Sequence, residues 1–534
     1  MPTALRTPGL LRAPVARTPA GRETSRLGVL LRGALLVGVA STAGGCARST
    51  PPTSAAHQAT VSIGIAQPAL GLAPDTGVAG VVRLLTSASL VTVAPSGKAQ
   101  PALASSWEQA PDGLTWRFRL REGLTFHDGR PLTAAAVRAL LAPDDTVVQP
   151  PSSVLPGLRD IVAVDAPSPL EVVVRLSRPS TLFLEALGMV AVRGPGDVPL
   201  DAGPFRVESR EPARTRLRAF PGFFQGRPAV DRVELRSYAT HRAAWGAMMR
   251  GEVDVLYEVA PEAVQFVEGG GGVRAYSFER PYVYFLGMNL AAPALREAAV
   301  RRALNRAIDR GQVIARALSG HGVPAAGHVW PRHWAHDAAV VPPAPDRAAA
   351  MRALDALGLR LTPATSDHGP SRLRFTVLVP AGYPVLERLA LVVQKQLSDA
   401  GVDVRLEPVP LPDLRNRLAT GRFEAYLNEM AAGPGLNWPY WFWRSTPDSA
   451  GWVLSGYGAA DAPLERIRGA RDDDALRRAV SDFQRVLVED PPGIFLCWGQ
   501  VSRAVTVRFG VPALPDRDVM RTLAQWRSAP VETR

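Results

Sequence analysis

The chain of 534 residues is longer than one hydrophobic core usually supports, so two or three domains are expected. Apolar residues make up 46% and charged residues 21%, which is the ordinary balance of a globular protein. The formal charge of +12 is partly local, because residues 1–45 contribute +5 and leave +7 for the rest of the chain. No basic run marks a phosphate-binding surface, so no nucleic-acid partner is expected.

The first 45 residues have the pattern of a secretory signal peptide. Six arginines precede or open a short apolar stretch at residues 33–40, and small residues then lead to Cys46. This stretch is far shorter than the roughly 20 residues that span a bilayer. The small residues before Cys46 resemble a bacterial lipoprotein signal, in which Cys46 would be lipidated and become the mature N-terminus. An ordinary cleaved signal with an incidental cysteine remains open, because Ala43 stands where lipoprotein signals usually carry leucine.

Residues 46–60 predict a flexible tether, because they are rich in Ser, Thr, Pro and Ala and have no apolar period. No later stretch approaches membrane-spanning length, so a soluble body is expected from about residue 61. The protein is therefore predicted to be exported to the cell envelope. It would lie in the periplasm or at the outer face of the cytoplasmic membrane, anchored by lipid through Cys46.

The body alternates between strand and helix patterns. Apolar residues alternate at Val61, Ile63 and Ile65, and again along residues 115–120, as in half-buried strands. Residues 301–309 predict a helix. Asp309 and Gln312 then fit a capping box that opens a second helix.

Further along, a strand at residues 373–379 is followed by a helix with apolar positions from Leu386 to Leu397. Gly401 ends this helix, and residues 402–406 predict another strand. A strand, a helix and a second strand in this order form a βαβ unit with parallel strands. The predicted fold class is therefore α/β.

Several segments, in chain order, resemble family 5 of the bacterial ABC-transporter solute-binding proteins, which includes dipeptide-, oligopeptide- and nickel-binding members. They begin with Pro-Ala-Leu-Ala-Ser-Ser-Trp-Glu at residues 101–108 and continue through most of the body. The further segments are residues 112–123, 126–134, 202–206, 223–231, 251–254, 286–289, 300–310 and 320–325, and Pro345-Asp346 at the start of a helix that ends near Gly358.

The resemblance implies a two-lobed, periplasmic-binding-protein-like fold of class II (cluster C) with an additional inserted domain. A discontinuous lobe I would combine residues 61–90, 202–285 and 496–534. Residues 91–201 would form the inserted domain II, and residues 286–495 would form lobe III. Two lobes joined by short crossings can close on a ligand by hinge motion.

The resemblance also implies the function. The protein would be the extracytoplasmic component of an ABC importer, capturing a peptide-like or other small organic solute and delivering it to a membrane permease complex. It is expected to act as a monomer. Two alternatives remain open: binding of nickel or a metal chelate, and ligand sensing at the envelope without transport.

In this family the ligand lies between the first and third domains. By that analogy the candidate ligand-binding residues lie on two segments that face the cleft. They are Tyr282, Tyr284, Asn289, Glu429, Asn437, Trp438, Tyr440 and Trp443.

Peptide-binding relatives place an aspartate near this second segment to pair with the peptide α-amine. This chain has no aspartate between Glu424 and Asp448. An ammonium group buried without a carboxylate partner is costly, and Glu429 is the candidate substitute. The sequence therefore argues against a conventional peptide ligand.

Aromatic residues are concentrated around this segment, and two interpretations remain open. They predict either an aromatic-lined pocket for an apolar, planar or cationic ligand, or interdomain packing. The set is Trp438, Tyr440, Trp441, Phe442, Trp443, Trp452 and Tyr457.

No catalytic, cofactor or metal site is predicted. The motifs GxSxG, HExxH and GxxxxGK[ST] are absent, and Cys46 and Cys497 are too far apart for a metal or redox motif. Cys497 follows an apolar run and predicts a buried thiol. Imidazole suits transition metals, but the four clustered histidines lie in a predicted loop in which Asp337 is the first acidic residue close by, so metal binding by them is left open. They are His321, His328, His333 and His336.

Overall fold

The computed structural model describes residues 59–66, 77–142, 155–194, 200–268, 271–364, 369–445, 456–512 and 517–529. The predicted signal peptide, Cys46 and nearly all of the predicted tether lie outside these residues. Within the described part of the chain, no helix is long and apolar enough to cross a membrane.

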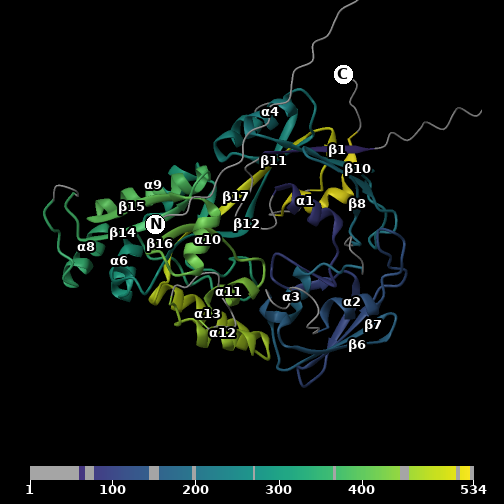
Figure 1. The fold of residues 1–534 in the computed structure, drawn as a ribbon, viewed down its shortest axis with the longest axis horizontal. Helices are drawn as coiled ribbons and strands as arrows, with labels where there is room; N and C mark the ends of the chain where they lie inside the picture. Colours follow the sequence, from purple (N-terminus) through teal and green to yellow (C-terminus); the bar gives the residue numbers. More distant parts are fainter. Residues whose placement is uncertain are drawn as a thin grey trace, which may run out of the picture. The chain divides into compact units, whose positions relative to one another are not determined.

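A mixed eleven-stranded sheet runs through most of the body (Figure 1). Its strands in spatial order are β15 (Val402–Val409), β14 (Leu373–Pro380), β16 (Ala425–Ala431), β12 (Val273–Met288), β17 (Gly493–Thr506), β11 (Val255–Val259), β1 (Thr60–Ala66), β10 (Arg232–Tyr238), β9 (Arg214–Ala219) and β8 (Phe205–Glu211), with β13 (Gly322–Pro324) paired to β17. The pairs β14–β15, β14–β16, β1–β10 and β1–β11 are parallel.

The predicted βαβ unit is confirmed. Strands β14 and β15 are parallel and connected by helix α9 (Pro384–Asp399). The chain leaves α9 through Gly401, whose φ of 82° suits glycine because it has no Cβ. Only the N-cap half of the predicted capping box is present: the Asp309 carboxylate accepts from the backbone N–H of Gln312 at 3.0 Å at the start of α7 (Arg310–Ala317), whereas the Asp309 N–H donates to the side chain of Gln396.

Residues that lie between β1 and β8 in the chain form a separate four-stranded antiparallel sheet. Its order is β4 (Ala104–Gln109), β5 (Thr115–Leu120), β7 (Glu171–Leu176) and β6 (Ile161–Ser168). Helices α2 (Ala134–Leu141) and α3 (Leu182–Met189) share its hydrophobic core. The small strand pairs are β2 (Val91–Val93) with β3 (Ala99–Pro101), and β18 (Phe509–Gly510) with β19 (Arg527–Ser528).

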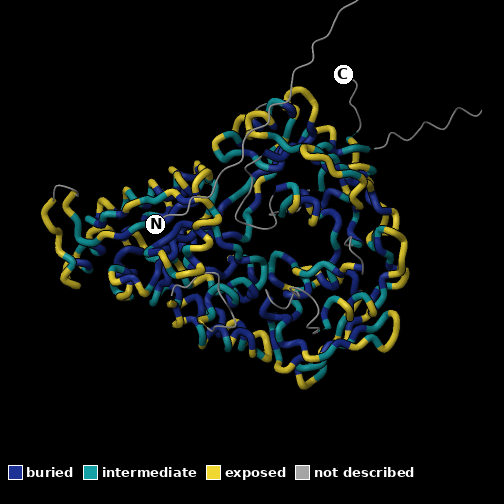
Figure 2. The backbone as a smooth tube through the Cα atoms, in the orientation of Figure 1, coloured by how far each residue is buried: buried dark blue, intermediate teal, exposed yellow. Residues whose placement is uncertain are grey.

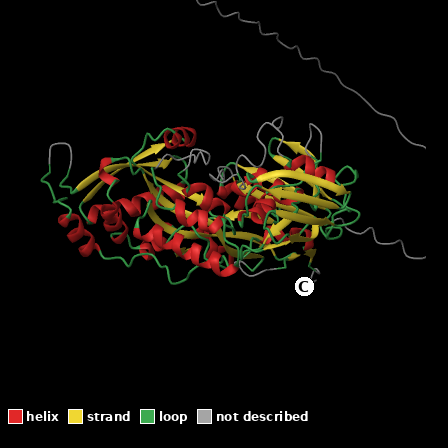
Figure 3. Ribbon diagram, turned by 90° about the horizontal axis from the view of Figure 1, so that it is seen from below, coloured by secondary structure: helices red, strands yellow, loops and turns green. Residues whose placement is uncertain are grey.

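Helices pack beside the strands throughout (Figure 3). Near the β1 end of the large sheet they are α1 (Gly77–Thr86), α4 (His241–Met249) and α5 (Val264–Glu268). Near the β14 end they are α6 (Ala298–Arg306), α7, α8 (Arg347–Ala356), α9, α10 (Leu411–Ala419), α11 (Asn437–Trp443), α12 (Asp461–Arg468) and α13 (Asp473–Glu489).

Strand β14 shows how the sheet divides the core. Phe375, Val377 and Val379 belong to the cluster shared with α6–α9, whereas Leu378 belongs to the cluster shared with α10–α13. Alternate side chains of a strand point to opposite faces, so a sheet covered by helices on both sides is apolar on both. The tube view shows the resulting buried interior (Figure 2). The predicted α/β class is confirmed; the domain boundaries remain a prediction.

Candidate functional site

A cavity of about 1380 Å³ lies along the middle strands of the large sheet, β11, β12, β16 and β17. One side of its wall comes from the β1 end, through α1 and β11. The other comes from the β14 end, through Tyr383, Glu429 and Trp438, and Met189 and Thr92 contribute from the part that carries the small sheet. Ligand pockets commonly measure about 300–1,000 Å³. This cavity is therefore large enough for a sizeable organic solute.

Strands β12 and β17 connect the two sides of the cavity. They pair from Val273 to Glu279 and again from Val283 to Gly287, with a register shift in between. The interruption leaves Arg280, Pro281 and Tyr282 outside the ladder, and all three line the cavity. A break in a ladder lets a strand bend without losing further hydrogen bonds. These residues therefore mark the crossing between the two sides.

Of the candidate ligand-binding residues, Tyr282, Tyr284, Glu429 and Trp438 line the cavity. Tyr284 and Glu429 face each other across the β12–β16 pair. The Glu429 carboxylate lies 3.2 Å from the guanidinium of Arg280, which in turn stacks 4.3 Å from the Tyr282 ring centre. Glu429, expected to substitute for the missing aspartate, is thus already paired with a cation of the chain.

The phenol of Tyr284 is kept protonated by its surroundings. Burial raises its pKa well above the ordinary value, and the negative charge of Glu429 adds to this effect. Deprotonation would place a second negative charge beside a carboxylate in a weakly solvated wall. Tyr284 therefore presents a neutral hydroxyl.

Asn289 and Asn437 make structural hydrogen bonds and are not among the residues that line the described cavity. The Asn289 amide donates to the carbonyls of Gly421 and Phe423 at 3.1 and 2.8 Å. Asn437 donates to the Leu182 carbonyl at 2.9 Å and accepts from the Gly157 N–H at 3.1 Å. Both amides hold loops together, and their roles as ligand contacts remain predictions.

The aromatic segment divides between cavity and core. Trp438 lines the cavity, whereas Tyr440, Trp443 and Tyr457 belong to a buried cluster that includes Phe285. Trp443 packs edge-on against Phe285 with ring centres 5.5 Å apart. Most of these aromatic residues thus serve core packing, and Trp438 is the one that lines the cavity within the described residues. Trp452 lies outside the described residues.

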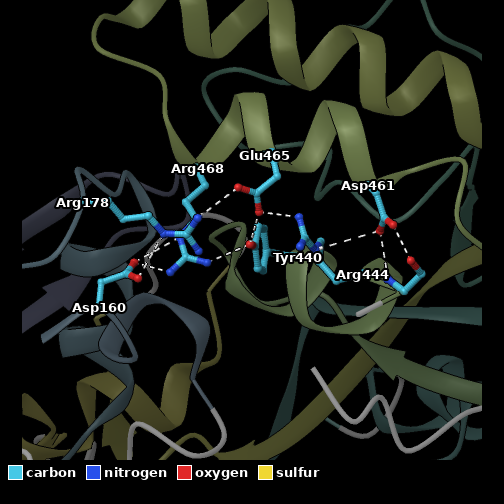
Figure 4. A network of polar contacts seen from close by, with 8 residues as sticks. Asp160, Arg178, Tyr440, Arg444, Asp461, Glu465 and Arg468 are labelled. Atoms are coloured by element: carbon cyan, nitrogen blue, oxygen red, sulfur yellow. Dashed lines mark hydrogen bonds and ion pairs between the residues drawn. The ribbon is translucent and has the colours of Figure 1, made fainter. Parts of the chain in front are cut away.

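Tyr440 belongs to a polar network that links α11 and α12 to the segment before β6 (Figure 4). Its hydroxyl donates to Glu465 at 2.5 Å and accepts from Arg468 at 2.7 Å. Arg468 also donates to Asp160 at 3.0 Å, and Arg178 joins Asp160 to Glu465 with two contacts of 3.2 Å. Tyr440 therefore fixes the position of α11, the helix that carries the cavity residue Trp438.

The four histidines do not gather into a metal site. His328 is fully buried: Trp443 donates to its Nδ1 at 2.9 Å, and its Nε2 lies 2.9 Å from the Ala431 carbonyl. Both ring nitrogens are occupied, so none is left for a metal. Nδ1 of His333 accepts from the backbone N–H of Ala335 at 3.2 Å. Within the described ranges, no group of three His, Cys, Asp or Glu side chains is placed to hold a metal ion.

Cys497 is fully buried, as predicted, and it is a free thiol. Burial raises its pKa to about 12, so the reactive thiolate does not form at neutral pH. This cysteine packs in the sheet core.

Residues 98–452 match the family model of the bacterial extracellular solute-binding proteins, family 5 middle. The chain belongs to this family. The match spans both sides of the cavity and the small sheet, in agreement with the resemblance carried by the sequence motifs.

Curated family 5 relatives align over most of the chain at low identity. The probable D,D-dipeptide-binding periplasmic protein DdpA of Escherichia coli K12 is 23% identical over 423 residues, covering 74% of this chain and 78% of that protein. The glutathione-binding protein GsiB of the same strain is 23% identical over 375 residues, covering 67% of this chain and 69% of that protein.

Solved structures support the same fold. NikA from Brucella suis in complex with Fe(III)-EDTA superposes with a TM-score of 0.76 at 21% identity, over 88% of this chain and 100% of that one. The oligopeptide-binding protein AppA from Bacillus subtilis in complex with a nonapeptide gives 0.72 at 19% identity, over 88% and 99%. These superpositions show the two-lobed fold of periplasmic binding proteins.

Most residues that line the cavity were not predicted from the sequence, among them Glu258, Trp330 and Arg503. Arg503 and Glu258 lie in strands without any motif, and their proximity depends on the pairing of β11 with β17. Sequence offers no signal for that register.

Proposed function

We propose that this chain is the solute-capturing component of an ABC importer and performs no chemistry on its ligand. The observation that carries the proposal is the cavity of about 1380 Å³ between two sides joined by β12 and β17. A ligand that contacts both sides at once stabilises the closed arrangement, which is how a binding protein signals its loaded state. A membrane permease complex would receive the solute.

The named relatives indicate the range of ligands. They are described as binding a D,D-dipeptide, glutathione, a nonapeptide or a metal chelate. For this chain we propose a peptide-like or other organic solute. No arrangement within the described residues favours a bare metal ion.

Tryptophan fluorescence tests solute capture, because Trp330 and Trp438 line the cavity. The purified protein, dialysed after mild denaturation and refolding, would be titrated with amino acids, short peptides and metal chelates. We expect a saturable change with one class of solute. Absence of saturable change with every class at millimolar concentration would contradict the proposal.

We further propose that the protein is exported and held at the envelope by lipid on Cys46. The basic, apolar and small-residue segments before Cys46 support this, as does family membership. Cys46→Ala is expected to move the protein from the membrane fraction to the soluble fraction. Unchanged fractionation of Cys46→Ala would rule out the anchor and leave solute capture unaffected.

A further inference from the structure

Five carboxylates line the cavity within the described residues, and four of them face a guanidinium of the chain. Glu279 lies 3.2 Å from Arg332, Glu429 lies 3.2 Å from Arg280, and Asp518 lies 2.9 Å from Arg503. The fourth, Glu262, lies 4.0 Å from Arg388. The fifth carboxylate is Glu258.

Glu258, on β11, has no hydrogen bond and no ion pair within the described part of the chain. It is partly buried in the cavity wall. A carboxylate that loses water when a cleft closes requires a cation or several donors in exchange. Its surroundings therefore favour a ligand that supplies positive charge.

The backbone directs Glu258 by a local irregularity. Strand β11 pairs with β17 at Leu256–Ala504 and at Val259–Ser502, with a register shift in between. Two residues, Tyr257 and Glu258, thus stand opposite Arg503 alone. Such a bulge changes the direction of a side chain and is common beside binding sites.

Arg503 holds the bulge in place. Its guanidinium donates to the Tyr257 carbonyl, stacks 3.9 Å from the Tyr257 ring centre, and pairs with Asp518 at 2.9 Å. These contacts commit its charge to Asp518 and the Tyr257 backbone. Arg503 also interacts electrostatically with Glu258, but its ion pair is with Asp518 and it makes no hydrogen bond or ion pair with Glu258 within the described residues.

The Tyr284 hydroxyl is the second polar group at this end of the cavity. No hydrogen bond to it is made within the described residues, and it is close enough to Glu258 to interact electrostatically. A neutral phenol can accept a hydrogen bond from an ammonium group that Glu258 neutralises. The two groups thus form a pair of acceptors for one cation.

The geometry points to Glu258, supported by the Tyr284 hydroxyl, as the site that receives an ammonium group of an organic solute. This inference rests on the proposed solute capture and names the ligand class. It also moves the amine partner away from the segment near residue 429, where the resemblance had placed it, to the opposite wall of the cavity.

The test uses matched pairs of probes: L-alanyl-L-alanine, L-lysine, putrescine and spermidine, each beside its fully N-acetylated form. Isothermal titration of the whole protein is expected to show binding of a free amine. Acetylation should weaken it by about ten- to a hundredfold, as expected for loss of a charge-assisted hydrogen bond. Glu258→Gln should weaken the free amine equally and leave the acetylated form unchanged.

Glu252→Gln is the matched control, because Glu252 precedes β11, pairs with Arg250 and does not line the cavity. It should bind within about twofold of the wild type. The melting temperature of unliganded Glu258→Gln should stay close to that of the wild type, since no hydrogen bond or ion pair within the described residues is lost.

Equal binding of free and acetylated probes, or unchanged binding by Glu258→Gln, would overturn the assignment. Failure of every amine to bind would overturn it as well. Solute capture itself would stand if the purified protein retained a solute without an amine, and it would fall only if no class of solute bound.

Discussion

At the scale of single residues, His328 shows how a histidine in a cluster that resembles a metal site can have a structural role. Its Nδ1 accepts from Trp443 and its Nε2 donates to Ala431, which fixes the neutral tautomer. Complete burial lowers its pKa to about 3. The imidazole therefore stays neutral in the folded protein at any physiological pH.

This pKa makes stability depend on pH. Because the folded value lies below the roughly 6.5 of an unfolded histidine, protonation favours the unfolded chain, and stability present above about pH 6.5 is lost as the pH falls toward 3. His328→Gln removes this pH-dependent contribution to the free energy of unfolding. Urea denaturation at about pH 7.5 and about pH 5 should show a loss on acidification that is smaller by about 2 kcal/mol in the variant.

His321→Gln is the control for this measurement, because His321 is partly exposed. It should retain the full acid loss. An equal acid loss in His328→Gln and wild type would show that the buried imidazole is not the responsible group.

Sequence reasoning placed individual residues near the cavity with mixed outcome. Tyr282, Tyr284, Glu429 and Trp438 reach its wall. Neighbours in the same segments point elsewhere, since helix α11 turns Tyr440 and Trp443 into the core while Trp438 faces the cavity. A short helix with aromatics on all sides has no periodicity that distinguishes its faces.

At the scale of elements, the crossing strands β12 and β17 are held close by a glycine. A Cβ added to Gly499 would lie 2.8 Å from Cε2 of Tyr284, closer than side chains tolerate. Gly499 also stands in the interrupted part of the ladder, beside β13. The close approach of β12 and β17 therefore depends on Gly499 having no side chain.

Gly499→Ala should displace the Tyr284 ring and lower the free energy of unfolding by about 1–3 kcal/mol. The matched control is Gly272→Ala, because nothing lies within 4 Å of the added Cβ there. The control should change stability by less than about 1 kcal/mol. Thermal unfolding of both variants checks this, and equal melting temperatures would argue against the close approach.

Elements with strong periodicity were predicted from the sequence, and irregular ones were not. The strands β1 and β5 and the β14–α9–β15 unit follow alternating or helical apolar patterns. The bulge at Tyr257 and Glu258 has no corresponding sequence pattern, because it is determined by pairing with a strand some 250 residues away. This is why Glu258 was found only in the structure.

At the scale of the whole molecule, the Asp160 network joins the part that carries the small sheet to the part that carries α12. The side chains of Asp160 and Arg468 are both more than nine-tenths buried and form an ion pair. A buried ion pair adds little stability compared with apolar packing, but removing one partner leaves the other charge buried without compensation. The network thus specifies how these parts pack.

Asp160→Asn should therefore destabilise the protein by about 3–5 kcal/mol. Glu171→Gln is the control, because its ion pair with Arg117 is largely exposed and should contribute less than about 1 kcal/mol. Chemical denaturation of both variants compares them. A loss in Asp160→Asn no greater than in the control would show that the network does not hold the parts together.

The two-lobed architecture was predicted from ordered motifs that resemble family 5, and not from local propensity. Motifs such as residues 112–123 and 126–134 form turns and strands that do not line the cavity, so they identify the fold without identifying the ligand. The ligand depends on side chains that converge from distant segments, which only the fold brings together.

Native mass spectrometry of protein purified without refolding tests the central claim most directly. We predict a complex whose mass exceeds that of the processed chain by one small organic molecule, released on denaturation and carrying an amine. A preparation that neither retains a solute nor binds one from a cell extract would contradict the account.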